Sequence, residues 1–392
     1  MDPDIPMSED CLYLNIWTGA GKENEKLPVL VWFFGGGLQC GYTAEMEFDG
    51  ERLARRGIVV VSVNYRVNVF GFLAHPQLTS QQPDAPANFG SLDQQAGLRW
   101  VLRNIAAFGG DPENVTIAGQ SAGGGSVLSQ MTCPDNFGMF QKAVIMSAMI
   151  RSPYEEGGVG VPQPLWEAEE NGQHFFGFLG VSCLEEARKL DAAFMAGNTS
   201  DEFLNFIPAD SEEELEERAK ELFGEEADTF LAFAESRRRD ERRGYAGVSG
   251  TECTIKGIFA NEKGEHGERY YYRFDPDIPG WDQPGTFHSS DLWFFFETLA
   301  KCWRPFVGHH YDLARKMCTY WVNFIKTGNP NGLDADGSAL EEWRPYTKEN
   351  PCGMAFESAG PRALDGEETA FASFLTDRII RSMERGKVWQ DG

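Results

Sequence analysis

The chain has 392 residues, 42% of them hydrophobic, so it can bury a large core in one domain or two. Its net charge of −25 argues against a nucleic-acid-binding function, because phosphate binding requires clustered Lys and Arg side chains. The sequence contains no run of 18 apolar residues, so we expect no membrane span. The first residues carry no basic or apolar segment of the kind found in signal peptides, and we therefore expect a cytoplasmic protein.

Short apolar runs alternate with amphipathic segments along most of the chain, which is the pattern of an α/β fold. Strands that alternate with helices imply right-handed crossovers and a mostly parallel sheet. The region 165–236 is mainly helical and acidic in pattern, and further helices are expected at 92–107, 309–326 and 368–385. The expected strands are residues 12–17, 28–34, 58–63, 115–118, 143–146, 194–197, 270–274 and 354–356.

The pattern G-x-S-x-G occurs once with its required context, at Gly119–Gly123. The apolar run 115–118 precedes it, and small residues leading into a helix follow it. A serine on a sharp strand-to-helix turn has an exposed hydroxyl close to helix N–H groups, as in the serine hydrolases. Ser121 is therefore the candidate nucleophile.

A serine nucleophile needs a base, and the base needs an acid that orients it. Of the six histidines, His288 is the best candidate, because it follows a turn, precedes a helix and lies downstream of the serine. Asp201 and Glu202 follow a short apolar strand at the place expected for the acid, and their composition alone does not choose between them. Both carboxylates could instead stabilise a helix N-terminus.

Three successive glycines, Gly35, Gly36 and Gly37, follow the strand at 28–34. Such a loop can bring free backbone N–H groups close to a reacting oxygen, so it is a candidate oxyanion hole. The eight cysteines include no C-x-x-C pair, which makes zinc and thiol-redox sites unexpected. We expect the chemistry to need no metal and no cofactor.

Together these residues resemble the type-B carboxylesterase family, the α/β-hydrolases that include para-nitrobenzyl esterases and cholinesterases. The resemblance covers almost the whole chain and includes Ser8–Asn15 (SEDCLYLN), Ser62–Leu73 and the stretch from Asn88 to Pro112. It implies a single α/β-hydrolase domain over residues 1–392. Within it, residues 150–265 would form a mostly helical insertion that includes the catalytic-acid loop.

The resemblance also implies roles for individual residues. Ser121 matches the nucleophile, His288 the base and Glu202 the acid, and this leaves Asp201 a structural role. The N–H groups of Gly36, Gly37 and Ala122 match the oxyanion donors.

Three departures from the family pattern affect the expected specificity. Phe34 stands where the family usually has histidine before the glycines, so the loop must be supported differently. The family's N-terminal strands and the loop that rims the active site are missing, which disfavours choline esters. The segment between Ser121 and Glu202 is also shorter than in relatives.

The expected activity is hydrolysis of small or aromatic carboxylic esters through an acyl-enzyme. The expected partner is a small-molecule ester, and the sequence does not indicate an oligomeric state. Aromatic residues near the predicted loops would favour flat, apolar substrates, although at least half of them should be ordinary core. The alternatives are a lipase-type hydrolase of longer acyl esters and a weakly active or non-catalytic family member. The aromatic residues expected near the catalytic loops are Phe33, Phe34, Trp281, Phe287 and Trp293–Phe296.

Overall fold

The computed structural model describes the greater part of the chain between residues 7 and 364. The helix expected at 368–385 lies outside the described residues, as do His75, His174 and His266. The described residues are 7–72, 81, 88–148, 193–202, 211–237, 255, 259, 267–282, 284–347, 349–364 and 374.

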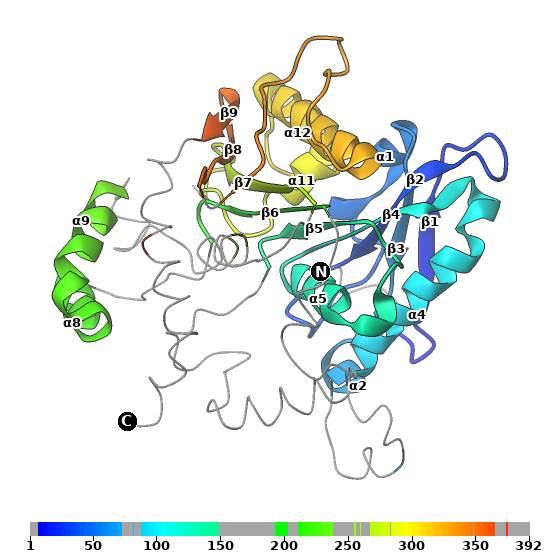
Figure 1. The fold of residues 1–392 in the computed structure, drawn as a ribbon, viewed down its shortest axis with the longest axis horizontal. Coiled ribbons are helices and arrows are strands. Elements are labelled where there is room, and N and C mark those ends of the chain that lie inside the picture. The colour runs from blue at the N-terminus through cyan, green and yellow to red at the C-terminus, as the bar shows by residue number, and fades with distance from the viewer. Residues whose placement is uncertain are drawn as a thin grey trace.

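A nine-stranded sheet forms the centre of the described part of the chain (Figure 1). Its strand order is β1-β3-β2-β4-β5-β6-β7-β8-β9, and all pairs are parallel except the two at the edges, β1 with β3 and β8 with β9. The strands are β1 (Leu14–Trp17), β2 (Leu27–Phe33), β3 (Val59–Val63), β4 (Gly110–Gln120), β5 (Lys142–Met146), β6 (Ala193–Thr199), β7 (Arg269–Asp275), β8 (Gly353–Glu357) and β9 (Gly360–Leu364).

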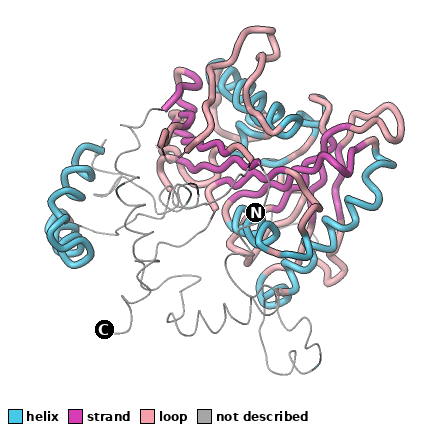
Figure 2. Tube along the Cα trace, viewed as in Figure 1, coloured by secondary structure: helices cyan, strands magenta, loops and turns pink. Residues whose placement is uncertain are grey.

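Helices cover both faces of this sheet (Figure 2). Helices α11 and α12 lie on one face, and α4 and α5 lie on the other. No helix within the described ranges is both long enough and apolar enough to cross a bilayer. The helices are α1 (Glu51–Arg55), α2 (Asn68–Phe72), α4 (Phe89–Asn104), α5 (Ala122–Thr132), α8 (Glu212–Phe223), α9 (Ala227–Arg237), α11 (Leu292–Phe295) and α12 (Gly308–Thr327).

The period-two alternation of the strands divides the core into two layers. On β2, Leu30 and Trp32 pack in the layer under α11 and α12, whereas Val29 and Val31 pack in the layer under α4 and α5. All four side chains are fully or almost fully buried. A strand buried on both faces must be apolar at every position, which explains the continuous apolar runs of β2, β3 and β5.

The topology has a switch point at the carboxyl ends of β2 and β4. The chain passes from β2 to β3 on one side of β2, and later returns to β4 on the other side. The loops that leave two such strands diverge, and ligands of α/β sheets bind at this switch point. The G-x-S-x-G turn follows β4 and the three glycines follow β2, so both candidate motifs lie at the switch point.

The mostly parallel sheet and all eight expected strands are confirmed, with ends that differ by a few residues. Strand β9 was not predicted, because it is a short edge strand that contains Pro361. The helix expected at 92–107 is α4, which begins three residues earlier and gives way to a 3-10 turn at Ile105–Phe108. Within the expected insertion, residues 193–199 are a central strand, and α8 and α9 are helical.

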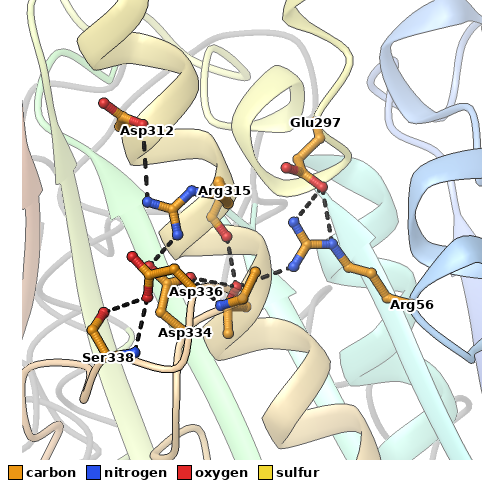
Figure 3. A network of polar contacts seen from close by, with 9 residues as sticks. Arg56, Glu297, Asp312, Arg315, Asp334, Asp336 and Ser338 are labelled. Carbon is orange, nitrogen blue, oxygen red and sulfur yellow. Dashed lines mark hydrogen bonds and ion pairs between the residues drawn. The ribbon is translucent and has the colours of Figure 1, made fainter.

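A polar network joins α1, the end of α11 and α12 on one face of the sheet (Figure 3). Arg56, just after α1, donates to Glu297 Oε2 at 2.9 and 2.6 Å and to the Thr319 hydroxyl at 3.1 Å. Arg315 on the same helix as Thr319 binds the buried carboxylate of Asp334. Glu297 follows α11, the short helix that comes after the His288 loop, so this network anchors the far end of α11.

We predict that Glu297→Gln lowers the free energy of unfolding by about 1–3 kcal/mol, because it leaves the largely buried Arg56 guanidinium without its counter-charge. The amide keeps the shape of the side chain, so the loss reports the charge. Urea denaturation of the variant measures the change. The matched control is Glu51→Gln, whose ion pair with Arg55 is exposed and whose loss should cost less than 1 kcal/mol. Equal losses in the two variants would contradict the role given to Arg56.

Candidate active site

Ser121 lies on a strained turn between β4 and α5. Its φ of 57° and ψ of −124° are values that a residue with a side chain rarely adopts. The turn is possible because Gly119 and Gly123 flank it: a Cβ on Gly119 would lie 2.3 Å from the Gly123 carbonyl oxygen, and one on Gly123 would lie 2.1 Å from the Phe33 carbonyl oxygen. Backbone packing this tight explains both glycines of the motif.

The glycine loop after β2 lies directly against this turn. A Cβ on Gly35 would be 2.8 Å from the Gln120 carbonyl oxygen and 3.1 Å from Ser121 Cβ. Gly36 and Gly37 have positive φ angles of 96° and 64°, and among the described residues no acceptor binds their N–H groups. Ala122 is the first residue of α5, so its N–H has no acceptor within the helix. The loop and the helix therefore offer free donors beside Ser121.

Phe34 supports the loop that it precedes. Its carbonyl oxygen accepts a hydrogen bond of 2.6 Å from the Tyr65 hydroxyl, and its ring stacks on the Tyr65 ring with centroids 4.3 Å apart. Both side chains are almost completely buried. A Cβ on Gly41 would lie 2.6 Å from the Phe34 ring, so the return of the loop also packs on this aromatic pair. Tyr65 thus provides the support that the replacement of histidine by Phe34 requires.

Buried Glu202 and partly buried His288 form a pair at the carboxyl edge of the sheet. Glu202 follows β6 and His288 lies in the loop after β7, and His288 Nδ1 is hydrogen-bonded to Glu202 Oε2. The other carboxylate oxygen of Glu202 accepts from the Thr199 N–H at 3.0 Å. Burial alone would raise the pKa of Glu202, but the hydrogen bond and charge of His288 together with the Thr199 N–H lower it. Glu202 is therefore held as a carboxylate that orients the imidazole.

Asp201 does not contact the imidazole ring in any hydrogen bond between described residues; it holds the loop on which His288 stands. Its carboxylate accepts from the Thr286 N–H at 2.6 Å, and its own N–H donates to the Thr286 carbonyl at 3.1 Å. Gly285 has a φ of 64°, and a Cβ there would lie 2.6 Å from the Asp201 carboxylate. The two adjacent carboxylates therefore make different contacts: Glu202 with the ring and Asp201 with the backbone.

Two residues near His288 were not singled out by sequence reasoning. The first is Gln120, whose amide nitrogen lies 3.1 Å from His288 Nε2. It is a variable position of the G-x-S-x-G pattern, so no motif pointed to it.

The second is Asp291, which is fully buried three residues after the histidine and accepts from the Tyr272 hydroxyl at 2.9 Å. Burial, followed by the nearby charge of Glu202, raises the pKa of Asp291 to about 7. The only sequence signal for this residue was a carboxylate in an otherwise apolar segment.

The structure brings the six predicted site residues to one edge of the sheet: Ser121, Glu202, His288, Gly36, Gly37 and Ala122. Ser121 adjoins Gln120, which in turn contacts His288. Within the described ranges, no group of three or more His, Cys, Asp or Glu side chains is arranged to hold a metal ion. The arrangement has a nucleophile, a base oriented by an acid, and free N–H donors, which are the parts that acyl transfer requires.

A family model described as "Carboxylesterase family" matches residues 1–161 and 247–371. This chain belongs to the carboxylesterase family. Its fold is the α/β-hydrolase fold: a solved structure named "PNB esterase" aligns with a TM-score of 0.65 and 25% identity, covering 96% of this chain and 87% of that chain.

Curated relatives match this chain over different lengths. A cholinesterase of Mus musculus is 46% identical over 154 residues, which are 39% of this chain and 25% of the cholinesterase. The bile salt-activated lipase of Homo sapiens is 29% identical over 430 residues, covering 87% of this chain and 56% of the lipase. The bile salt-activated lipase of Rattus norvegicus is 30% identical over 431 residues, covering 87% of this chain and 68% of that lipase. The chain thus spans about a quarter and just over half of the first two relatives.

We predict that Asp291→Asn changes how stability depends on pH. Because the pKa of Asp291 is raised in the folded protein, the unfolded chain binds fewer protons than the folded one between the two pKa values, and stability falls as the pH rises towards 7. The asparagine variant lacks this fall. Its free energy of unfolding, relative to the parent, should therefore rise by about 2–3 kcal/mol between pH 5 and pH 8.

Urea denaturation at several pH values measures this difference. Asp312→Asn is the control, because the Asp312 side chain is 72% exposed and its loss should leave the pH dependence of the parent. If Asp291→Asn and the parent had parallel stability curves from pH 5 to pH 8, the buried carboxyl would not be protonated as we expect.

Proposed function

We propose that the protein is a serine carboxylesterase that hydrolyses small-molecule carboxylic esters through an acyl-enzyme intermediate. The observation that carries the proposal is the pair of buried Glu202 and partly buried His288 beside the strained turn of Ser121. A carboxylate bound to Nδ1 fixes the tautomer in which Nε2 can accept a proton from a hydroxyl. No purely structural role requires a serine in a disfavoured conformation at this place.

In the proposed reaction, Ser121 attacks the ester carbonyl while His288 takes the hydroxyl proton. The N–H groups of Gly36, Gly37 and Ala122 stabilise the negative oxygen of the tetrahedral intermediate. His288 then donates its proton to the departing alcohol, which leaves Ser121 acylated. A water molecule, deprotonated by His288, attacks the acyl-enzyme and releases the acid. Glu202 stabilises the imidazolium that forms in each half of the reaction.

The side chains near His288 favour small or aromatic esters. Phe33, Phe34 and Phe294–Phe296 are fully buried and belong to the core, so they do not line a substrate site. Phe287, next to His288, is partly buried and packs edge-on against Trp293. Arg304 lies over the Phe287 ring at 5.1 Å and over Trp303 at 4.6 Å. Phe287 and Trp293 thus place aromatic side chains next to the catalytic base, where they can contact an apolar or aromatic ester.

We predict that a fluorophosphonate labels Ser121 and that Ser121→Ala lowers kcat by roughly 10⁴- to 10⁶-fold without unfolding the protein. The alanine removes the atom that forms the acyl-enzyme. Peptide mapping identifies the labelled serine, and circular dichroism checks the fold. Ser126→Ala is a suitable control, because that buried serine lies one turn further along α5 and should stay unlabelled in the parent. An adduct on a different serine would refute the assignment.

We predict that kcat/KM for para-nitrophenyl esters is highest for short acyl chains. Each methylene that fits a pocket contributes about 1–3 kcal/mol, so the preference should be graded from acetate to palmitate. The similarity to bile salt-activated lipases makes longer acyl esters the second candidate. A maximum at ten or more carbons would favour that lipase-type activity. A chain that neither hydrolyses the series nor reacts with the fluorophosphonate would be a non-catalytic family member.

A further inference from the structure

The side-chain amide of Gln120 is hydrogen-bonded to His288 Nε2, the ring nitrogen that must accept the serine proton in catalysis. Its amide nitrogen lies 3.1 Å from His288 Nε2, and the residue is 3% exposed. It is the last residue of β4 and immediately precedes Ser121, so the amide and the hydroxyl leave the sheet from adjacent positions. The contact is therefore made at the centre of the candidate site.

The neutral imidazole has one nitrogen that donates and one that accepts. His288 Nδ1 is bound to the Glu202 carboxylate, which can only accept, so Nδ1 carries the proton. Nε2 then has a single lone pair, which lies in the plane of the ring. The Gln120 amide and the Ser121 hydroxyl both require this lone pair, and only one of them can bind it fully.

The glycine loop and strand β5 both lie next to Gln120. Its amide oxygen faces the glycine loop, since a Cβ on Gly35 would lie 3.2 Å from that oxygen. Its backbone is paired with Met146 of β5 in the parallel ladder. The amide is thus directed from the sheet edge, past the glycine loop, to the imidazole.

We propose that Gln120 is a positioning residue, which holds the neutral ring of His288 by donating to Nε2 and yields that nitrogen to the Ser121 hydroxyl when the reaction begins. The proposal rests on the esterase function proposed above, for which it adds a step before proton transfer. A donor on Nε2 stabilises the neutral ring, because the protonated ring has no lone pair to accept the bond. Gln120 therefore favours the form of the base that is ready to accept a proton.

Among the described residues, the charged and titratable groups that act on the His288 ring include Glu202 and Asp291. Glu202 faces the ring from the end of β6, and Asp291 faces it from the following segment of the same loop. Tyr272 of β7 acts through its hydrogen bond to Asp291. Gln120 contributes an uncharged amide on the Nε2 side. A carboxylate at position 120 would instead stabilise the protonated ring.

The test compares Gln120→Met, which keeps the length of the side chain and removes the donor, with Gln120→Glu. The acidic limb of kcat/KM against pH should move to higher pH by about 0.5–1 unit in Gln120→Met, because a neutral hydrogen bond stabilises one protonation state by that amount. It should move further in Gln120→Glu. On the alkaline plateau, fluorophosphonate labelling of Gln120→Met should be two- to tenfold faster, since Ser121 no longer competes for Nε2.

Gln94→Met is the matched control. Gln94 is also buried and binds Ser126 on α5, but it makes no contact with His288 within the described residues. Its acidic limb should coincide with that of the parent, which separates the Nε2 contact from a general loss of a buried amide. A limb that stays in place in both Gln120 variants, or that moves to lower pH in Gln120→Met, would overturn the proposal. Slower labelling of Gln120→Met would do so as well.

Ring-carbon NMR of histidine provides a readout that does not depend on activity. The chain has six histidines, and loss of one signal in His288→Asn identifies the relevant ring. The midpoint of its titration should lie at higher pH in Gln120→Met than in the parent. If the parent hydrolysed no ester while this midpoint still moved, the esterase function would fail and the contact would stand. An unmoved midpoint in an active enzyme would refute the contact alone.

Discussion

The hydrogen bond between Glu202 and His288 is the interaction on which the rest of the candidate site depends. It joins the end of β6 to the loop after β7, two segments that are 86 residues apart in sequence. A buried carboxylate without a partner would cost several kcal/mol, and the imidazole together with the Thr199 N–H offsets that cost. The pair is therefore possible only when the whole carboxyl edge of the sheet is assembled.

The neighbouring side chains divide the support of this pair between them. Asp201 binds the backbone of the loop that carries His288. Glu297, which follows the next helix α11, binds Arg56 just after α1. Asp291 brings a second carboxyl close to Glu202, and its raised pKa keeps it protonated below about pH 7. Two carboxylates buried together would repel, so a neutral Asp291 lets Glu202 keep its charge. Glu202 can therefore remain the charged carboxylate of the pair because its neighbour Asp291 is protonated.

Much of the fold could be predicted from sequence because its signals are local. Strands such as β2 and β5 are continuous apolar runs, and the glycines around Ser121 are required by backbone contacts within a few residues. The choice between Asp201 and Glu202 could not be made from their composition, because it depends on which carboxylate faces His288 in space. The family resemblance indicated Glu202, and the geometry agrees with it.

Other features of the site had no local signal at all. Gln120 occupies a position that the motif leaves free, and its importance comes from a residue 168 positions away. Tyr65 lies 31 residues after Phe34, and only the folded sheet brings its hydroxyl to the Phe34 carbonyl. Such contacts join residues at the ends of different strands or in the loops that follow them, so neither periodicity nor motif spacing can predict them.

The order of strands explains how these distant residues form one site. Along the sheet the sequence of strands is β3, β2, β4, β5, β6 and β7, all parallel, so their carboxyl ends lie at one edge. Tyr65 follows β3, the glycine loop follows β2, Ser121 follows β4, Glu202 follows β6, and the loop of His288 follows β7.

Five of these six strand ends thus contribute one part each, and neighbouring segments support them. Phe34 can replace a polar loop support because Tyr65, which follows the adjacent strand β3, supplies both a ring and a hydroxyl. A substitution in one loop is therefore compensated from the neighbouring strand, while the strand order that aligns the catalytic groups is retained.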